Sequence, residues 1–253
     1  MSVSFSKPKF DKKQLWTAAI LPLWVVAGFG VSWAVVSVVF DLLRHLGISF
    51  IGMNQAVLSS VLASCVYALS ALIIIGVPLW IKKYRTSRQD IGLTGLPTWM
   101  DILLAPAGFI IYFLLSALFA YLFSIFLPGI DMNQAQETGF GNLYYYYEYV
   151  LAFAMLIIVA PVAEEVIFRG YLYGKLRKIV PVWAAIVIVS VVFGFVHGQW
   201  NVGIDVFALS IILCTLREVT GSIWAGILLH MLKNGLAFYL LFINPSLLST
   251  IGG

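Results

Sequence analysis

The sequence is poor in charged residues. Only 10% of its 253 residues are Asp, Glu, Lys or Arg, and 62% are hydrophobic, whereas a soluble domain is about 25% charged and about 45–50% apolar. The mean hydropathy is +0.99. These values exclude an ordinary soluble domain and predict a polytopic membrane protein, with membrane lipids as its surroundings.

Cysteine is also scarce, since the chain contains only Cys65 and Cys214. Both lie in apolar stretches and neither belongs to a CxxC or a similar spacing, so no cysteine metal site or structural disulfide is indicated. The motifs GxSxG, HExxH and GxxxxGK[ST] are absent, which argues against the common serine hydrolases, zinc metalloproteases and nucleotide-binding loops. We therefore expect no cofactor.

Long apolar segments make up most of the chain. A membrane-spanning helix needs about 20 predominantly apolar residues, and seven segments qualify, although 202–216 is short and contains Asp205. The segment 41–54 is a candidate for the membrane interface. We predict an all-α bundle of about seven or eight transmembrane helices, forming a single integral membrane domain over residues 1–253. The predicted spans are 15–40, 55–81, 102–127, 149–170, 182–200, 202–216 and 222–243.

The few basic residues predict the orientation. Lys and Arg cluster in the amino-terminal tail, at 82–88 and at 175–178, whereas the loop 128–147 has none and ends in a run of tyrosines. Basic loops stay on the cytoplasmic side and aromatic residues gather at the interface, so we predict a multi-pass protein with a cytoplasmic amino terminus. This clustering also argues against nucleic acid as a partner. The compact size and the lack of a targeting signal favour a prokaryotic cell membrane.

Charged residues interrupt the fourth apolar segment at Glu164, Glu165 and Arg169. Residues four apart share a helix face and neighbours do not, so Glu165 is expected to pair with Arg169 while Glu164 points elsewhere. An unpaired carboxylate in apolar surroundings is suited to act as a general base. The alternative is that these charges mark the point where the helix leaves the membrane.

Two histidines lie in later predicted spans. His197 follows Phe193 by four residues, and His230 precedes Asn234 by four residues. Taken singly, such groups are explained by packing or by hydrogen bonds between helices. Together with Glu164 they predict a hydrolytic site, in which a base activates water and polar donors stabilise the oxyanion.

Three motifs carry a family resemblance. EEVIFR at 164–169, FGFVH at 193–197 and HMLKN at 230–234 resemble the EExxxR, FxxxH and HxxxN motifs of the CAAX protease and bacteriocin-processing (CPBP, or Abi) family of intramembrane endopeptidases. This family includes the type II CAAX prenyl proteases. The motifs occur in the family's order, within a motif region of about 149–243.

The resemblance implies a glutamic-type, metal-free membrane endopeptidase whose site lies among the later helices. Glu164 would act as general base with His197, His230 and Asn234 would form the oxyanion pocket, and Glu165 with Arg169 would orient or neutralise. The implied substrates are membrane-associated peptides or proteins, prenylated CaaX-type tails among them.

Several alternatives stay open. A zinc-dependent protease using the same residues is one, because one Glu and two His form a plausible zinc set. A non-proteolytic immunity or scaffold protein of the same fold is another. A proton-coupled transporter would also place ionisable groups in spans, but the sequence shows no repeat. Lys233 has no role in the motifs and is expected to snorkel, line the cavity, or pair with Asp205 or Glu218.

The predicted span edges place the motif residues at different depths. Glu164 would lie about 22 Å from one face and His197 about 22 Å from the other, at 1.5 Å per residue, within a core of about 30 Å. For the two to meet, the span edges must shift, the helix must break near Gly194 and Gly198, or the bilayer must be thinner there.

Overall fold

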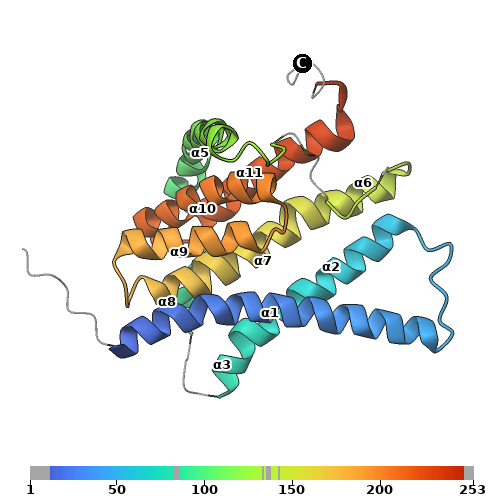
Figure 1. Cartoon of the computed structure of the whole chain (residues 1–253), viewed down its shortest axis with the longest axis horizontal. Coiled ribbons are helices and arrows are strands. Elements are labelled where there is room, and N and C mark those ends of the chain that lie inside the picture. Colours follow the sequence, from blue (N-terminus) through green and yellow to red (C-terminus); the bar gives the residue numbers. More distant parts are fainter. Residues whose placement is uncertain (1–11, 82–85, 133, 135–137, 142, 248–253) are drawn as a thin grey trace, which may run out of the picture.

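The computed structural model describes residues 12–81, 86–132, 134, 138–141 and 143–247. Within these residues the chain forms eight continuous helices and no strand, which confirms the all-α prediction (Figure 1). Three of the eight change between α and π geometry along their length. The α-helical elements are α1 (Lys12–His45), α2 (Gln55–Ala71), α3 (Val77–Trp80), α4 (Arg88–Ile91), α5 (Trp99–Phe126), α6 (Tyr146–Phe153), α7 (Ala160–Glu165), α8 (Gly174–Leu176), α9 (Val182–Phe195), α10 (Trp200–Thr220) and α11 (Trp224–Phe238).

Five helices of the described chain are long and apolar enough to cross a membrane. They correspond to five of the seven predicted spans. The remaining two predictions correspond to α9, which is a shorter apolar helix of 14 residues, and α10, whose 21 residues include charged side chains. The five are Gln14–His45, Gln55–Trp80, Trp99–Phe126, Tyr146–Leu176 and Trp224–Ile243.

Two predicted boundaries need correction. The first span does not end at residue 40, because α1 continues to His45, into the segment 41–54 that is a candidate for the interface. The fourth span is not limited to 149–170, because one continuous helix runs from Tyr146 to Leu176. We call this helix the central helix, since its residues 167–174 are all buried.

A proline shapes the second long helix. Pro78 follows a π-helical segment (Leu72–Gly76), and proline has no N–H to donate to a carbonyl one turn earlier. The indole N–H of Trp24 donates instead to the carbonyl of Ile74, at 3.0 Å. The missing backbone bond of the second helix is thereby replaced by a side chain of α1.

The helices pack in two groups around the central helix (Figure 1). α1 and α2 lie along one side of it, and α9, α10, α11 and α5 lie on the other. Phe168 of the central helix contacts both groups, with its ring centroid 5.7 Å from Phe29 of α1 and 4.9 Å from Phe193 of α9. A second apolar cluster joins α5, α10 and α11 around Tyr112 and Leu213.

The basic segments gather at one end of the molecule. The start of α1, α3 and α8 lie toward the left of Figure 1, and the α1–α2 turn and the start of α6 toward the right. At the basic end Lys178 forms an ion pair with Asp90, and this contact, with hydrogen bonds from Ser87, holds the pKa of the Asp90 carboxyl well below its usual range. Residues 1–11 and 82–85 of the predicted basic segments lie outside the described residues.

Candidate active site

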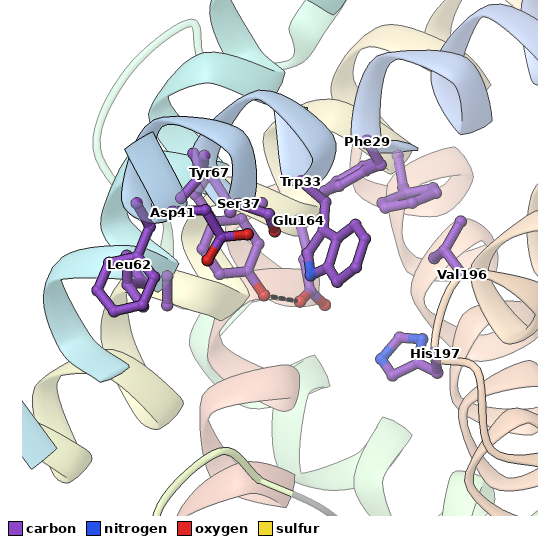
Figure 2. Close-up of a pocket in the computed structure, with 14 residues that line it drawn as sticks. Phe29, Trp33, Ser37, Asp41, Leu62, Tyr67, Glu164, Val196 and His197 are labelled. Atoms are coloured by element: carbon purple, nitrogen blue, oxygen red, sulfur yellow. Dashed lines mark hydrogen bonds between the residues drawn. The ribbon is translucent and has the colours of Figure 1, made fainter. Parts of the chain in front are cut away.

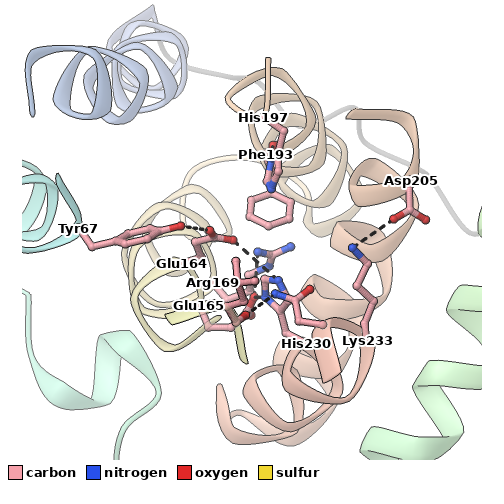
Figure 3. Close-up of polar contacts among 11 residues, drawn as sticks. Tyr67, Glu164, Glu165, Arg169, Phe193, His197, Asp205, His230 and Lys233 are labelled. Carbon is pink, nitrogen blue, oxygen red and sulfur yellow. Dashed lines mark hydrogen bonds and ion pairs between the residues drawn. The ribbon is translucent and has the colours of Figure 1, made fainter. Parts of the chain in front are cut away.

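The two neighbouring glutamates of the central helix have separate environments. Glu165 is fully buried and accepts a hydrogen bond from Arg169 at 3.0 Å, which is the predicted pair four residues apart. Glu164 retains 12% side-chain exposure and faces away from this pair (Figure 3). One carboxylate is therefore neutralised inside the protein, and the other is directed to a different space.

His230 of α11 lies against both glutamates (Figure 3). Its Nδ1 is 3.1 Å from Oε1 of Glu165, and its Nε2 is 3.8 Å from Oε2 of Glu164. The imidazole is almost fully buried, with 3% exposure. His230 thus connects the last long helix to the central helix at the level of the two carboxylates.

Besides its ion pair with Glu165, Arg169 contacts an aromatic ring. Among the described residues, Nε and Nη2 of Arg169 have no hydrogen-bond partner. The guanidinium instead lies 4.2 Å from the centroid of the Phe193 ring, within the range of a cation–π interaction. Phe193, the first residue of FxxxH, therefore stabilises the arginine of EExxxR.

His197 is held by the carbonyl of Phe193. Its Nδ1 is 2.7 Å from that oxygen, and because a carbonyl only accepts hydrogen bonds, Nδ1 must carry the proton. In a neutral ring Nε2 then holds the lone pair and is the nitrogen able to accept a proton. Helix α9 ends at Phe195, so His197 lies in the turn after it, just before Gly198 with its φ of +72°.

Glu164 and His197 line the same cavity, which has a volume of about 670 Å³ (Figure 2). Tyr67 of α2 also lines it and donates a hydrogen bond to Oε1 of Glu164 at 2.5 Å. Sequence reasoning missed Tyr67, and its only signal was a phenol inside an apolar span. Most of the wall comes from α1 and α2, so the prediction that the site lies among the later helices holds for the motif residues and not for the cavity around them.

Asn234 makes a contact different from the one the family role suggests. Its Nδ2 donates to the carbonyl of Leu156 at 2.8 Å. Leu156 belongs to a π-helical segment (Ala154–Val159), in which Ala160 donates to the carbonyl five residues earlier. The next donor in that register would be Pro161, which has no N–H. The side chain of Asn234 therefore satisfies the carbonyl of Leu156, and neither Asn234 nor His230 lines the cavity.

The depth mismatch becomes much smaller because the central helix extends to Leu176. Counted from that basic end, Glu164 is about 18 Å along its helix at 1.5 Å per residue. Counted from Val182, the start of α9, His197 is about 22 Å along its own. The shift of the span edge accounts for most of the correction, and the end of α9 before His197 adds a break of the kind that Gly194 and Gly198 suggested.

A comparison with known protein families matches the region that contains these contacts. Residues 146–236 match the model described as "Type II CAAX prenyl endopeptidase Rce1-like". This segment, 91 of the 253 residues, is similar to the Rce1-like family. It includes all seven residues of the three motifs, and it begins at the first residue of the central helix.

One curated protein is similar to part of this chain. It is a Bacillus subtilis (strain 168) protein named "Putative membrane peptidase YdiL", 34% identical over 77 residues. The match covers 30% of this chain and 32% of the relative, so the chain spans about a third of the length of that protein. No solved structure matches the chain significantly.

A second polar cluster joins α5, α10 and α11, and it includes Lys233 at a variable position of the HxxxN motif. Lys233 lies 3.4 Å from Oδ2 of Asp205, which is one of the partners the sequence allowed. The other oxygen of Asp205 accepts from the hydroxyls of Tyr112, at 2.7 Å, and Ser116, at 2.5 Å. Glu218 instead pairs with Arg177 at 2.6 Å. The cluster therefore joins α11 to α5 and α10 about one helical turn after His230.

The donor groups of the site do not form a metal-binding cluster. Among the described residues, no group of three or more His, Cys, Asp and Glu side chains is arranged to hold a metal ion. One nitrogen of His230 is directed at Glu165 and one of His197 at a backbone carbonyl. The zinc-dependent alternative would require these side chains to rearrange.

Proposed function

We propose that this protein is an intramembrane endopeptidase in which Glu164 and His197 activate a water molecule. The observation that carries the proposal is that the two neighbouring carboxylates have different environments. Glu165 is neutralised by Arg169 and by the contact with His230, whereas Glu164 opens into a cavity that His197 also lines. The similarity of residues 146–236 to a family of endopeptidases supports it.

The chemistry follows from the atoms of these two residues that can accept a proton. A water between them would lose a proton to the carboxylate of Glu164 or to Nε2 of His197 while its oxygen attacks the peptide carbonyl. The same proton is then delivered to the departing amine when the C–N bond breaks. Atoms and charge balance with one water consumed, and no nucleophilic side chain is required.

The remaining motif residues would hold this arrangement. The contacts of Glu165 with His230 of α11 and of Arg169 with Phe193 of α9 would fix the rotation of the central helix. His230 also lies 3.8 Å from Glu164. Support for His230 and Asn234 as an oxyanion pocket comes from the family motifs, because the described contacts direct both side chains to other protein groups. A positioning function is the second role that these contacts support.

The proposed substrates are membrane-associated peptides or proteins, with prenylated CaaX-type tails as one class. Most of the cavity wall consists of aromatic and aliphatic side chains from α1 and α2, which suits an apolar or lipidated segment. We also infer that α9 and α10 lie at membrane depth, giving seven membrane helices. At 21 residues α10 is about 31 Å long, close to the thickness of the hydrocarbon core.

Cleavage of quenched peptides by the purified protein in liposomes tests the proposal. The panel contains a prenylated CaaX peptide, its unprenylated form and several unprenylated apolar peptides, with the wild type, Glu164→Gln and His197→Gln compared. We expect each variant to lose at least about 100-fold in kcat/KM, the usual scale for a lost general base. His45→Gln is the matched control, because His45 is exposed and its Nδ1 also contacts a carbonyl four residues earlier.

The other outcomes separate the alternatives. Activity that a chelator removes and zinc restores would replace the metal-free mechanism with a zinc-dependent one. No cleavage of any peptide by folded wild type would favour the non-proteolytic membrane protein. A proton flux across the liposomes that depends on Glu164, without cleavage, would favour the transporter.

A further inference from the structure

One end of the cavity contains an acidic residue that the family motifs do not use. Asp41, near the end of α1, lines the cavity together with Ser37 and Tyr67 (Figure 2). Its side chain is exposed, and no hydrogen bond or ion pair of its carboxylate occurs among the described residues. The nearest cation on α1, Arg44, is placed 6.0 Å over the ring of Phe40.

The charges around the cavity all have one sign. Of the described residues that line it, Asp41 and Glu164 are acidic, His197 is the one titratable base, and none is Lys or Arg. The two cations closest to the motifs are already paired, Arg169 with Glu165 and Lys233 with Asp205. The cavity therefore attracts positive charge and repels a carboxylate.

The length of the cavity sets the size of the segment it can hold. Its α1 wall runs from Phe29 to Asp41, which is about 18 Å at 1.5 Å per residue. An extended peptide rises about 3.3 Å per residue, so five to six residues fit along this wall. The middle of the wall is apolar, with Trp33, Val36 and Phe40.

We propose that the cavity selects an extended apolar peptide segment with a positively charged amine or guanidinium at the end next to Asp41. Asp41 is then a specificity-determining residue that contacts the cation of the substrate. A free carboxylate at that end is disfavoured. The proposal deepens the proposed function, on which it rests for the identity of the cavity as a substrate site.

Binding of labelled peptides to the Glu164→Gln variant tests the proposal without cleavage. Each probe has six apolar residues, capped ends and one flanking Lys, Gln or Glu, on the amino side in one set and the carboxyl side in the other. A peptide with flanking Gln and a free amino terminus distinguishes a terminal amine from a lysine. Affinities are measured by fluorescence anisotropy in a nonionic detergent, once at low salt and once at high salt.

We expect the Lys peptide to bind about fivefold more tightly than the Glu peptide in one of the two sets, the scale of a partly exposed ion pair. The preference should disappear in Asp41→Asn, reverse in Asp41→Lys, and weaken at high salt. Gln55→Lys is the matched control, because it adds the same charge as Asp41→Asn on an exposed residue that does not line the cavity. It should leave the preference unchanged.

Two results would overturn the inference. One is a ratio of Lys-peptide to Glu-peptide affinity that is the same with Asp41 present and in Asp41→Asn. The other is the absence of measurable binding of any probe. Cleavage of the Gln peptide by the wild type is measured separately. Its absence alone would count against the proposed function, while a preference that depends on Asp41 would still support the inference about the cavity.

Discussion

At the scale of single residues, the site depends on which hydrogen-bond partner each side chain finds. Glu164 and Glu165 are adjacent in the chain, yet Glu165 contacts Arg169 and His230 while Glu164 accepts from Tyr67. The helical turn explains the first pairing, since residues four apart share a face. The hydrogen bond from Tyr67 to Glu164 joins residues 97 positions apart, so it depends on the packing of α2.

Tyr67→Phe should lower kcat about tenfold with little change in KM. The substitution removes the O–H that holds Glu164 at 2.5 Å, and a hydrogen bond to a charged group contributes about 1.5–3 kcal/mol. Initial-rate kinetics on the best peptide of the panel measure the effect. Tyr121→Phe, an exposed tyrosine on α5, provides the comparison. A variant with unchanged kcat would show that Tyr67 does not position the carboxylate.

Arg169→Met should destabilise the fold strongly. It would leave Glu165 as a fully buried carboxylate facing only His230, and breaking a buried pair by removing one partner costs about 3–5 kcal/mol. The melting temperature and the folded yield in detergent report the loss. Arg88→Met changes an exposed arginine and should leave both values near those of the wild type. Equal melting of the two variants would contradict the structural importance of the pair.

At the scale of helices, close backbone contacts set the position of His197. Gly194 of α9 and Gly203 of α10 face each other, and a Cβ built at Gly194 would lie 2.7 Å from the carbonyl oxygen of Gly203. The two helices are joined by a short turn that contains His197. Any increase in their separation therefore moves the histidine relative to the cavity.

Gly194→Ala should lower the melting temperature and kcat together. The added methyl meets backbone that can yield only by separating the helices, and overpacking of this kind costs about 1–3 kcal/mol. Gly30→Ala in α1 is the control, because nothing lies within 4 Å of its built Cβ, and it should be neutral or slightly stabilising. Thermal unfolding and peptide cleavage are measured on both. Unchanged activity in Gly194→Ala would show that the contact between Gly194 and Gly203 does not set the position of His197.

At the scale of the whole molecule, the arrangement of the ends fits a single orientation in the membrane. Helix α8, which contains Lys175, lies at the end opposite to the start of α6, whose first residue is the exposed Tyr146 (Figure 1). Basic residues favour the cytoplasmic face. The face of the membrane at each end is still a prediction, and it can be tested directly.

Labelling of single cysteines with an impermeant maleimide measures the orientation. In a Cys65→Ser and Cys214→Ala background, Tyr146→Cys should react in intact cells, and Lys178→Cys only after lysis. Both positions are exposed, so a difference reports the side of the membrane and not burial. The reverse pattern would place the amino terminus outside.

The sequence by itself determined the membrane class, most of the long helices, and the pair between Glu165 and Arg169. Composition and the helical repeat are local properties, so they can be read without knowing which helices touch. Only the tertiary structure decided that Tyr67 and Asp41 share a cavity with Glu164, and that Asn234 satisfies the carbonyl of Leu156. These contacts join helices far apart in the chain, and their geometry follows from close packing and from the need to satisfy every buried backbone group in an apolar surrounding.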